Sequence, residues 1–436
     1  MYKKPIVAVA MSGGVDSSVA AALLEKQGFV VFGITMKTFC YVKTPGGPKT
    51  CCGFEGIESA RAVCKKLGIP HYTADVSKEF TKKVVDDFIS EYRAGRTPNP
   101  CVKCNQFIKF GILLNLVKKY GADFLATGHY ARIKQIKISP TPFLPLRKGE
   151  GKGGGQNSKT KITYHLLRGV DKNKDQSYFL YNLNQKQLSQ IIFPLGNFKK
   201  EEVRNLARKF KLSVAEKPES QEICFVNTNL SEFLSARIKT KPGEIVDSGG
   251  KVLGKHRGIA FYTVGQRAGI GGKGPYYVAK INKNKNQLVV TNNLKDTLIL
   301  KKEIVVGKTN WVRGAFLKNK TVLTQVRYRS APIFGKIKNL GRGTAEVKFG
   351  KPVPRSHDAA GMAVPKSKTG MAVPRMQAGM AVPRLSAGMA AEGLATEGLA
   401  TGGLATEGLA IFAPAPGQSA VFYKGDECLG GGVIEK

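Results

Sequence analysis

Residues 6–18 read IVAVAMSGGVDSS, and this stretch predicts the architecture of the first half of the chain. The short apolar run at its start is typical of a buried strand in a parallel sheet. Gly13 and Gly14 favour a tight turn, and the residues after them have apolar side chains at helical spacing, with Gly28 as the stop. A strand, a glycine turn and a helix N-terminus form a cradle for an anion, because the free N–H groups of the first helical turn point at the bound group.

The full string SGGVDSS narrows the identity of that anion. The Walker A pattern places a Lys before Ser or Thr, and this string has no such Lys. Behind an apolar strand, the string resembles the pyrophosphate loop of the N-type ATP pyrophosphatases. That resemblance implies that ATP is cleaved between its α and β phosphates and that AMP passes to an oxygen of the substrate. The two glycines alone are equally compatible with a purely structural turn.

The charge balance indicates a partner that carries many negative charges. The chain has 69 Lys and Arg against 31 Asp and Glu, which gives a net charge of +38. A surplus of this size favours nucleic acid as the partner. No apolar run approaches the roughly 18–20 residues of a membrane span, and the run behind MYKK predicts a strand rather than a signal peptide. We therefore expect a cytoplasmic protein with no membrane partner.

The first 135 residues alternate between apolar strands and helical segments. This alternation predicts an α/β fold with a doubly wound parallel sheet, like that of the adenine nucleotide α-hydrolases. Ligands of such sheets lie at the carboxyl ends of the strands, so residues 12–17, Met36 and the pair Gly128-His129 are expected in one crevice. Residues 93–105 contain prolines and no helical period, and we expect a loop there.

Changes in composition and in strand and helix pattern along the chain predict three domains. We expect the pyrophosphatase domain over 1–212, a small β-rich central domain over 213–283 and a C-terminal β-barrel over 284–436. A stretch rich in Pro, Gly and Lys at about 137–161 is expected to be a floppy insertion. At about 355–410, Gly-Met-Ala recurs every nine residues and Gly-Leu-Ala every five. Both periods are too short for a solenoid unit, so we expect a low-complexity insertion there as well.

Three cysteines fall in expected loops near the nucleotide crevice. Cys101 and Cys104 belong to NPCVKCN, and Cys224 belongs to SQEICF. A CxxC pair can ligate a metal or carry redox chemistry, but the chain has no second CxxC to complete a zinc site. A cysteine in a basic loop tends to have a lowered pKa and so to be a nucleophilic thiolate.

Seven motifs follow SGGVDSS in a fixed order: TPNPCVKCNQFIKF, GHYAR, KDQSYFL, SQEICF, GQRAGIGG, VRYRS and PGQSAVFYKGDECLGGG. Together they resemble the tRNA-specific 2-thiouridylase (MnmA) family over nearly the whole chain outside the two insertions. The resemblance implies an enzyme, a tRNA-uridine 2-sulfurtransferase, which uses ATP and Mg²⁺ to adenylate the C2 oxygen of the wobble uridine (position 34). Sulfur from a cysteine persulfide then replaces AMP, so that the products are 2-thiouridine, AMP and pyrophosphate.

The resemblance also implies partners and site residues. The implied partners are tRNAs for Lys, Glu and Gln, and a persulfide-carrying donor protein or cysteine desulfurase. Cys104 matches the nucleophile of the family, and Cys224 matches its persulfide-bearing cysteine, with a transient disulfide between the two. The implied ATP contacts are Ala10, Met11, Ser12, Gly13, Gly14, Val15, Asp16, Ser17, Met36 and Gly128. The implied contacts to the target base are Asn99, Pro100 and Cys101, and those to tRNA are His129, Lys174, Asp175, Gln176, Arg327, Tyr328 and Gln418.

Three alternatives stay open on the residues themselves. Some members of the family have Asp where this chain has Cys101, so Cys101, Cys104 and Cys224 could together ligate three irons of a [4Fe–4S] cluster. No other metal site is expected. The SGGVDSS loop also fits an ATP-dependent ligase or amidotransferase that acts on a small acid, and the positive charge fits a non-catalytic RNA-binding protein.

Overall fold

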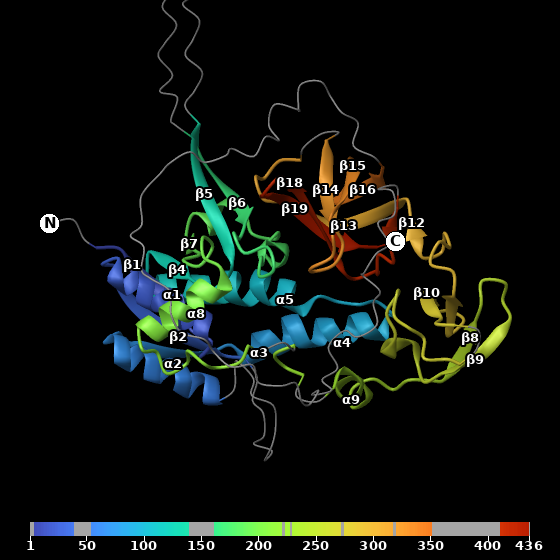
Figure 1. Cartoon of the computed structure of the whole chain (residues 1–436), viewed down its shortest axis with the longest axis horizontal. Helices are drawn as coiled ribbons and strands as arrows, with labels where there is room; N and C mark the ends of the chain where they lie inside the picture. The colour runs from blue at the N-terminus through green and yellow to red at the C-terminus, as the bar shows by residue number, and fades with distance from the viewer. Residues whose placement is uncertain are drawn as a thin grey trace, which may run out of the picture.

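The computed structural model describes residues 4–38, 54–138, 161–219, 223–226, 229–271, 274–316, 320–350 and 410–435. Along this part of the chain, an α/β region comes first, a small β-rich unit follows, and a barrel comes last (Figure 1). Residues 139–160 and 355–409 of the two expected insertions lie outside the described residues. Within the described ranges, none of the helices combines the length and apolar character that spanning a bilayer requires.

The α/β region is built on one five-stranded sheet with the order β3-β2-β1-β4-β7, in which every neighbouring pair is parallel. The chain first moves outward from β1 to β3 and then returns to the other side of β1. This reversal leaves a crevice at the carboxyl end of β1. The strands are β1 (Ile6–Ala10), β2 (Val30–Lys37), β3 (His71–Asp75), β4 (Phe124–Ala126) and β7 (Ile191–Ile192).

Helices cover both faces of this sheet, as the predicted doubly wound fold requires. On one face Val7 and Val9 pack with α1 (Val15–Lys26), α2 (Phe54–Leu67) and α8 (Lys200–Lys209). On the other face, Ala8 belongs to a cluster with Phe110 and Leu113 of the helical segment Cys104–Leu113. The remaining short helices are α3 (Ser77–Phe80), α4 (Asp86–Arg93), α5 (Pro100–Lys103), α6 (Leu114–Lys119), α7 (Gln185–Leu188) and α9 (Leu230–Ser235), with helical turns at Thr81–Val85, Ser177–Phe179 and Ile259–Phe261.

The expected loop over 93–105 is wrong in its second half. Helix α5 begins at Pro100, and the chain stays helical from there to Lys119. The side chain of Asn99 caps this helix by accepting a hydrogen bond of 3.3 Å from the N–H of Val102, and proline is favoured at the first helical position because it has no N–H to satisfy. Cys101 and Cys104 therefore lie in the first turns of a helix. The pair Asn-Pro is the sequence signal for this helix start.

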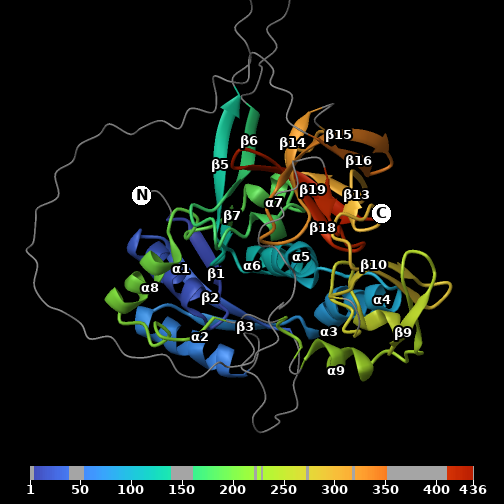
Figure 2. The same cartoon turned by 45° about the vertical axis from the view of Figure 1, so that its right-hand side comes forward.

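The small central unit is a four-stranded sheet with the order β10-β11-β8-β9. Its strands are β8 (Gly243–Val246), β9 (Val252–His256), β10 (Tyr277–Asn282) and β11 (Gln287–Thr291). Ile245, Val278 and Leu288 form its own small core. The unit lies beyond α4, on the side away from β1 (Figures 1 and 2).

The last unit is a closed antiparallel barrel of six strands, which confirms the predicted β-barrel. The order is β13-β16-β15-β14-β18-β19, and a further β13–β19 pairing closes it. Among the described strands of the barrel, closure pairs both edges of every strand. The strands are β13 (Glu303–Trp311), β14 (Thr321–Gln325), β15 (Ile333–Gly341), β16 (Thr344–Phe349), β18 (Ser419–Lys424) and β19 (Glu427–Ile434), and beside them β12 (Leu300–Lys301) pairs with β17 (Ile411–Phe412).

A hairpin of the α/β region joins the barrel directly. Strands β5 (Ala131–Ile138) and β6 (Lys161–Arg168) pair with each other, and Cys428 of β19 pairs with Leu166 of β6. The hairpin therefore stands beside the barrel in both views (Figures 1 and 2). Lys137, Ile138 and Lys161, at the ends of the insertion expected at about 137–161, belong to the ladder of this hairpin.

Candidate active site

The SGGVDSS loop forms a compact turn at the N-terminus of α1. Gly13 has φ = 72°, in the left-handed region that favours glycine, and a side chain there would collide with the backbone of Gly56. The hydroxyl of Ser17 accepts a 3.1 Å hydrogen bond from the N–H of Ser12, and Ser18 donates one of 2.9 Å to the carbonyl of Gly14. Gly14 precedes α1 and has no side chain to cap it, so the first turn of the helix is open to an anion.

The turn after β4 lies directly against this loop. A Cβ on Gly128 would lie 2.8 Å from the carbonyl carbon of Asp16 and from the backbone nitrogen of Ser17. The turn is held by Thr127 Oγ1 and His129 Nδ1, which lie 2.6 Å apart. The strand order thus brings Gly128 to the loop, as the sheet topology predicts. The absence of side chains on Gly13 and Gly128 lets the backbones of Gly56 and of Asp16-Ser17 approach closely, which makes the turn compact.

The two cysteines of the predicted sulfur chemistry share one apolar environment. Cys104 and Cys224 are both half-buried, and both pack against a cluster that contains Phe80, Phe88 and Phe225. Met36, at the end of β2, packs against the same cluster. Residues far apart in the sequence are therefore gathered at one end of the sheet.

The remaining described cysteines divide into one exposed and two buried. Cys101 is exposed, whereas Cys64 and Cys428 are buried. Burial raises the pKa of Cys64 to about 11 and raises that of Cys428 further, so both stay protonated thiols. Among the described residues no three His, Cys, Asp or Glu side chains are grouped to hold a metal ion, so Cys101, Cys104 and Cys224 do not form a ready set of cluster ligands.

Charged residues connect the loop to the segment before Cys224. Lys200 Nζ lies 2.6 Å from Asp16 Oδ1 and 3.0 Å from Glu219 Oε1, and Lys174 Nζ lies 2.6 Å from Glu219 Oε2. The hydroxyl of Tyr130 donates a 2.8 Å hydrogen bond to Asp16. Burial, and then Asp16, raise the pKa of Tyr130, so it remains a donor. Burial raises the pKa of Glu219, but Lys174 and Lys200 together outweigh it and lower that pKa below its usual value.

A cavity of about 220 Å³ lies between α4, the start of the helix at Pro100 and the barrel. Four of its charged groups form two ion pairs, with Lys103 2.9 Å from Asp87 and Arg96 2.7 Å from Glu91. Val102 and Lys103 line it, but Cys101 and Cys104 do not. The lining consists of Asp87, Glu91, Arg96, Pro98, Asn99, Val102, Lys103, Gln106, Phe107, Tyr181, Asn182, Lys308, Gly417, Ser419 and Val433.

Comparison with known proteins places this site in a family. Residues 5–228 match the family described as tRNA methyl transferase HUP domain, residues 231–292 its PRC-barrel domain, and residues 410–434 an aminomethyltransferase beta-barrel domain. The tRNA-specific 2-thiouridylase MnmA of Geobacter metallireducens is 40% identical, over 98% of this chain and 96% of its own. The chain belongs to the tRNA-specific 2-thiouridylase family.

Further relatives have the same name. MnmA 2 of Thermoanaerobacter sp. is 45% identical over 79% of this chain and 90% of its own. MnmA of Carboxydothermus hydrogenoformans is 37% identical over 99% of this chain and 97% of its own. The predicted family is therefore confirmed along nearly the whole chain.

Several family positions expected to touch tRNA make internal contacts in this member of the family. Asp175 is buried and accepts hydrogen bonds of 3.0 and 3.1 Å from the N–H groups of Gly169 and Ser177. Gln176 accepts a 3.0 Å bond from the N–H of Tyr130. Lys174 is the ion-pair partner of Glu219. Asp175 thus holds the segment after β6 in shape, Gln176 joins it to the turn after β4, and Lys174 joins it to Glu219.

Two other positions join the parts of this thiouridylase to each other. Arg327 donates hydrogen bonds of 2.6 and 2.8 Å to the carbonyls of Val264 and Ala413, which links the central unit to the barrel. Gln418 donates bonds of 3.1 and 3.2 Å to the carbonyls of Thr97 and Pro98. These carbonyls come just before the helix that begins at Pro100 and carries Cys101 and Cys104, which we call the cysteine helix. The sequence motifs contain no signal of this positioning role.

The aromatic positions of the family are packed to different degrees. His129 is only 8% exposed, and its ring centre lies 5.8 Å from those of Phe110 and Phe193. Burial, and then Lys109, hold the pKa of His129 well below its usual value, so the ring is neutral. Tyr328 is half-buried, with its ring centre 4.4 Å from that of Phe179.

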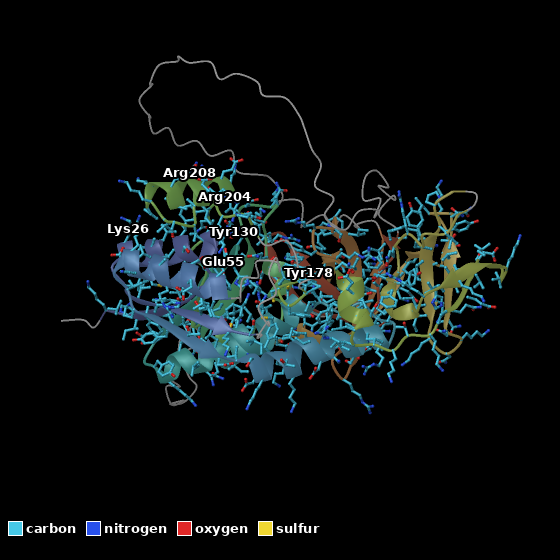
Figure 3. All side chains as sticks on the ribbon, turned by 90° about the horizontal axis from the view of Figure 1, so that it is seen from below. Lys26, Glu55, Tyr130, Tyr178, Arg204 and Arg208 are labelled. Atoms are coloured by element: carbon cyan, nitrogen blue, oxygen red, sulfur yellow. The ribbon has the colours of Figure 1, made fainter. Side chains whose placement is uncertain are left out.

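Sequence reasoning missed Tyr130, Lys200 and Glu219. Lys200 lies at the start of α8, where the sequence shows only one lysine beside another, and nothing marks it as the partner of Asp16. Arg204 and Arg208 follow on the same helix (Figure 3). Glu219 lies next to the SQEICF motif, and this position is the one sequence feature that could have marked it as a site residue.

Proposed function

We propose that this protein is an ATP-dependent tRNA sulfurtransferase that converts the wobble uridine, U34, into 2-thiouridine. The observation that carries the proposal is the pairing of two features at one end of the sheet. An open helix N-terminus with glycines around it is suited to ATP, and two half-buried cysteines on one apolar cluster are suited to sulfur transfer. The membership in the tRNA-specific 2-thiouridylase family supports the same reaction.

The nucleotide is assigned to the loop and its neighbours. The N–H groups at the start of α1 would stabilise the departing pyrophosphate, and Mg²⁺ bound with ATP would supply further neutralising charge. Gly13, Gly14 and Gly128 would present backbone to the phosphates, and Met36, at the end of β2, would lie at the adenine. The full set of proposed ATP contacts is Ala10, Met11, Ser12, Gly13, Gly14, Val15, Asp16, Ser17, Met36 and Gly128.

The first step activates the uridine. Its C2 oxygen attacks the α-phosphorus of ATP, an O–P bond forms, and pyrophosphate leaves with the electron pair of the broken P–O bond. The C2 carbon then carries AMP, which is a far better leaving group than the original oxygen. We place Asn99, Pro100 and Cys101 beside this base, because the capped start of α5 lies next to Cys104.

The second step replaces AMP with sulfur. A donor protein delivers a terminal sulfur to Cys224, which becomes a persulfide. Either this sulfur attacks C2 and Cys104 then cleaves the sulfur–sulfur bond, or Cys104 first attacks the persulfide and releases hydrosulfide, which attacks C2. Both routes expel AMP and leave a Cys104–Cys224 disulfide, which a cellular reductant must reduce before the next cycle. The shared apolar cluster around the two cysteines supports a disulfide between them.

The substrate is assigned from charge and family. A net charge of +38 suits a polyanion, and phosphate contacts would supply most of the affinity while the target uridine is turned out of its stack. We propose tRNAs for Lys, Glu and Gln as substrates, bound across domains 1–212, 213–283 and 284–436. The proposed tRNA contacts are His129, Lys174, Asp175, Gln176, Arg327, Tyr328 and Gln418, and those with internal partners would also orient the domains.

The test is mass spectrometry of tRNA nucleosides after incubation with the protein, ATP, Mg²⁺ and a persulfide or sulfide donor. We expect 2-thiouridine at position 34, with AMP and pyrophosphate in equal amounts. A ligase acting on a small acid would instead keep full turnover after Cys224→Ser. Absence of 2-thiouridine with every donor would contradict the proposal.

A further inference from the structure

Asp16 places a carboxylate in the first turn of the helix whose N-terminus is assigned to the ATP phosphates. It is the second residue of α1, directly after Val15. A carboxylate at this position can turn back and accept the N–H groups of its own helix, where it occupies the place that an anionic ligand needs. Its charge also repels phosphates close by. A loop that binds ATP must therefore control both the direction and the charge of this side chain.

Two donors from outside the loop bind this carboxylate. The hydroxyl of Tyr130 donates a 2.8 Å hydrogen bond to Asp16 Oδ1, and Lys200 Nζ lies 2.6 Å from the same oxygen. Within the part of the chain that the structure describes, no backbone N–H of α1 donates to the carboxylate. Asp16 is thus bonded to other segments rather than to its own helix, and an ammonium group balances its charge.

Both donors are themselves held in place. Tyr130 is 2% exposed, and burial, followed by Asp16, raises the pKa of its hydroxyl, which therefore keeps its proton. Lys200 is 9% exposed, its N–H donates a 2.9 Å bond to Asp171, and its ammonium group also lies 3.0 Å from Glu219. The same ammonium group lies 5.9 Å from the ring centre of Tyr130. Because both donors are already ordered, they hold the carboxylate in one orientation before ATP binds.

We propose that Tyr130 and Lys200 are positioning residues of the nucleotide site, which keep the carboxylate of Asp16 out of the anion position at the N-terminus of α1 and balance its charge. This inference rests on the proposed function, since it takes that N-terminus as the phosphate site. Neither residue needs to touch ATP, because both act through Asp16. The same bonds join the loop to the turn after β4 and to α8, which keeps the loop in place for the nucleotide.

The experiment is calorimetric titration of the full chain, without tRNA, with Mg²⁺ and an ATP analogue that cannot be cleaved between its α and β phosphates. For Tyr130→Phe we expect the Kd to rise about fivefold, less than the full contribution of a hydrogen bond to a charged group, because the carboxylate keeps Lys200. For Lys200→Met we expect a rise of about thirtyfold, because the charge of Asp16 is left unbalanced. Lys200→Arg keeps the charge and should recover part of the affinity.

A second background separates action through Asp16 from a direct or merely structural role. If Tyr130 acts through the carboxylate, Tyr130→Phe should change the Kd by less than about twofold once Asp16→Ala is present. Tyr181→Phe is the matched control. Tyr181 is as buried as Tyr130, but its hydroxyl lies 3.2 Å from Ser419 Oγ of the barrel, so the Kd should not change.

The outcomes decide the inference in both directions. Equal Kd values for the wild type and Tyr130→Phe, or the same fivefold loss in the Asp16→Ala background, overturn it. Tyr130→Phe keeps the ring in the core, so the test does not depend on the folding of Lys200→Met. If Asp16→Ala does not fold, Asp16→Asn keeps the shape of the side chain, and Lys200→Met should then have little effect, because no charge needs balancing.

Failure of the inference can be distinguished from failure of the proposed function. A wild type that binds no ATP analogue overturns both. A wild type that binds the analogue, together with an unaffected Tyr130→Phe variant, overturns the inference alone. Because the titration contains no tRNA, its result does not depend on formation of 2-thiouridine.

Discussion

The nucleotide loop, which is the SGGVDSS loop at residues 12–18, and the cysteine helix, which begins at Pro100, serve one proposed reaction. They are held in different ways. The loop is shaped by bonds between its own residues, such as the 3.1 Å bond from Ser12 to Ser17 and the 2.9 Å bond from Ser18 to Gly14. Tyr130 and Lys200 add distant contacts to its Asp16. The start of the cysteine helix depends on residues more than three hundred positions away. A local site can be read from a short motif, whereas a site held by distant segments cannot.

The distant support of the cysteine helix comes from the barrel and the central unit. The N–H of Thr97 donates a 2.8 Å bond to the carbonyl of Pro416, and its hydroxyl donates one of 2.9 Å to Thr263. Gln418 completes the support through the carbonyls of Thr97 and Pro98. The domains added after the α/β region thus position the start of the cysteine helix.

Substitution of the two cysteines should have the largest effect, and it should affect sulfur transfer but not the reaction at the nucleotide loop. Cys104→Ser and Cys224→Ser are each expected to lower formation of 2-thiouridine by about a thousandfold or more, because a hydroxyl cannot carry or release the sulfur. Pyrophosphate release that depends on tRNA should continue, since the nucleotide loop is intact. Both products are measured in one reaction, and loss of pyrophosphate release in these variants would contradict the division of labour.

Substitution in the loop should abolish both steps together. Gly13→Ala places a side chain at φ = 72° against the backbone of Gly56, so we expect ATP affinity to fall by about a hundredfold or more. Gly28→Ala is the matched control, because Gly28 has φ = 84° but nothing within 4 Å of its added Cβ. Calorimetric titration with ATP measures the difference, and equal losses in both variants would show that backbone strain alone is responsible.

A substitution at Gln418 should weaken the contact between the barrel and the cysteine helix without affecting the nucleotide loop. Gln418→Ala removes the two hydrogen bonds to Thr97 and Pro98, and we expect the rate of 2-thiouridine formation to fall about tenfold through misplacement of the helix. ATP affinity should be unchanged. Gln287→Ala, whose side chain contacts only Glu244 of the central unit among the contacts described, is the control. A fall in ATP affinity with Gln418→Ala would show that the two regions are not independent.

Acid should destabilise the fold at His129, whose ring packs against Phe110 of the cysteine helix. The pKa of His129 is held well below its usual value by burial, so the unfolded chain takes up a proton near pH 6.5 that the folded chain refuses. Stability is therefore complete above that pH and falls as the pH drops below it, by about 2 kcal/mol between pH 7 and pH 5. Urea unfolding at both values measures this loss. His129→Gln should be less stable at pH 7 and should show a shallower loss with acid; an unchanged slope would contradict the assignment.

The smallest effect is expected at the exposed cysteine. Cys101→Asp should keep the rate of 2-thiouridine formation within about twofold, because a persulfide route uses only Cys104 and Cys224. A reaction that depends on an iron–sulfur cluster would instead lose activity when one of its three ligands is changed. Iron content and visible absorption of anaerobically purified protein, wild type and variant, accompany the activity measurement.

The predictions from sequence succeeded where interactions between residues close together in the chain determine the local structure. The strand, turn and helix around Gly13 were predicted because apolar runs, glycine and helical spacing act within a few residues. The helix start at Pro100 differs from the expected loop because proline, which interrupts a helix interior, is favoured at the first helical position behind the capping side chain of Asn99. The internal partners of Arg327 and Gln418 could not be predicted, since each partner is a backbone carbonyl of a distant segment.

The sequence by itself determined the nucleotide loop, the order of the three units, the family and the identity of the candidate cysteines. Only the tertiary structure decided that Cys104 and Cys224 share one apolar cluster, that the barrel holds the start of the cysteine helix, and that Lys200 joins Asp16 to Glu219. The physical reason is distance along the chain. Propensity and spacing act locally, whereas an ion pair between α1 and α8 exists only after the sheet has brought the two helices together.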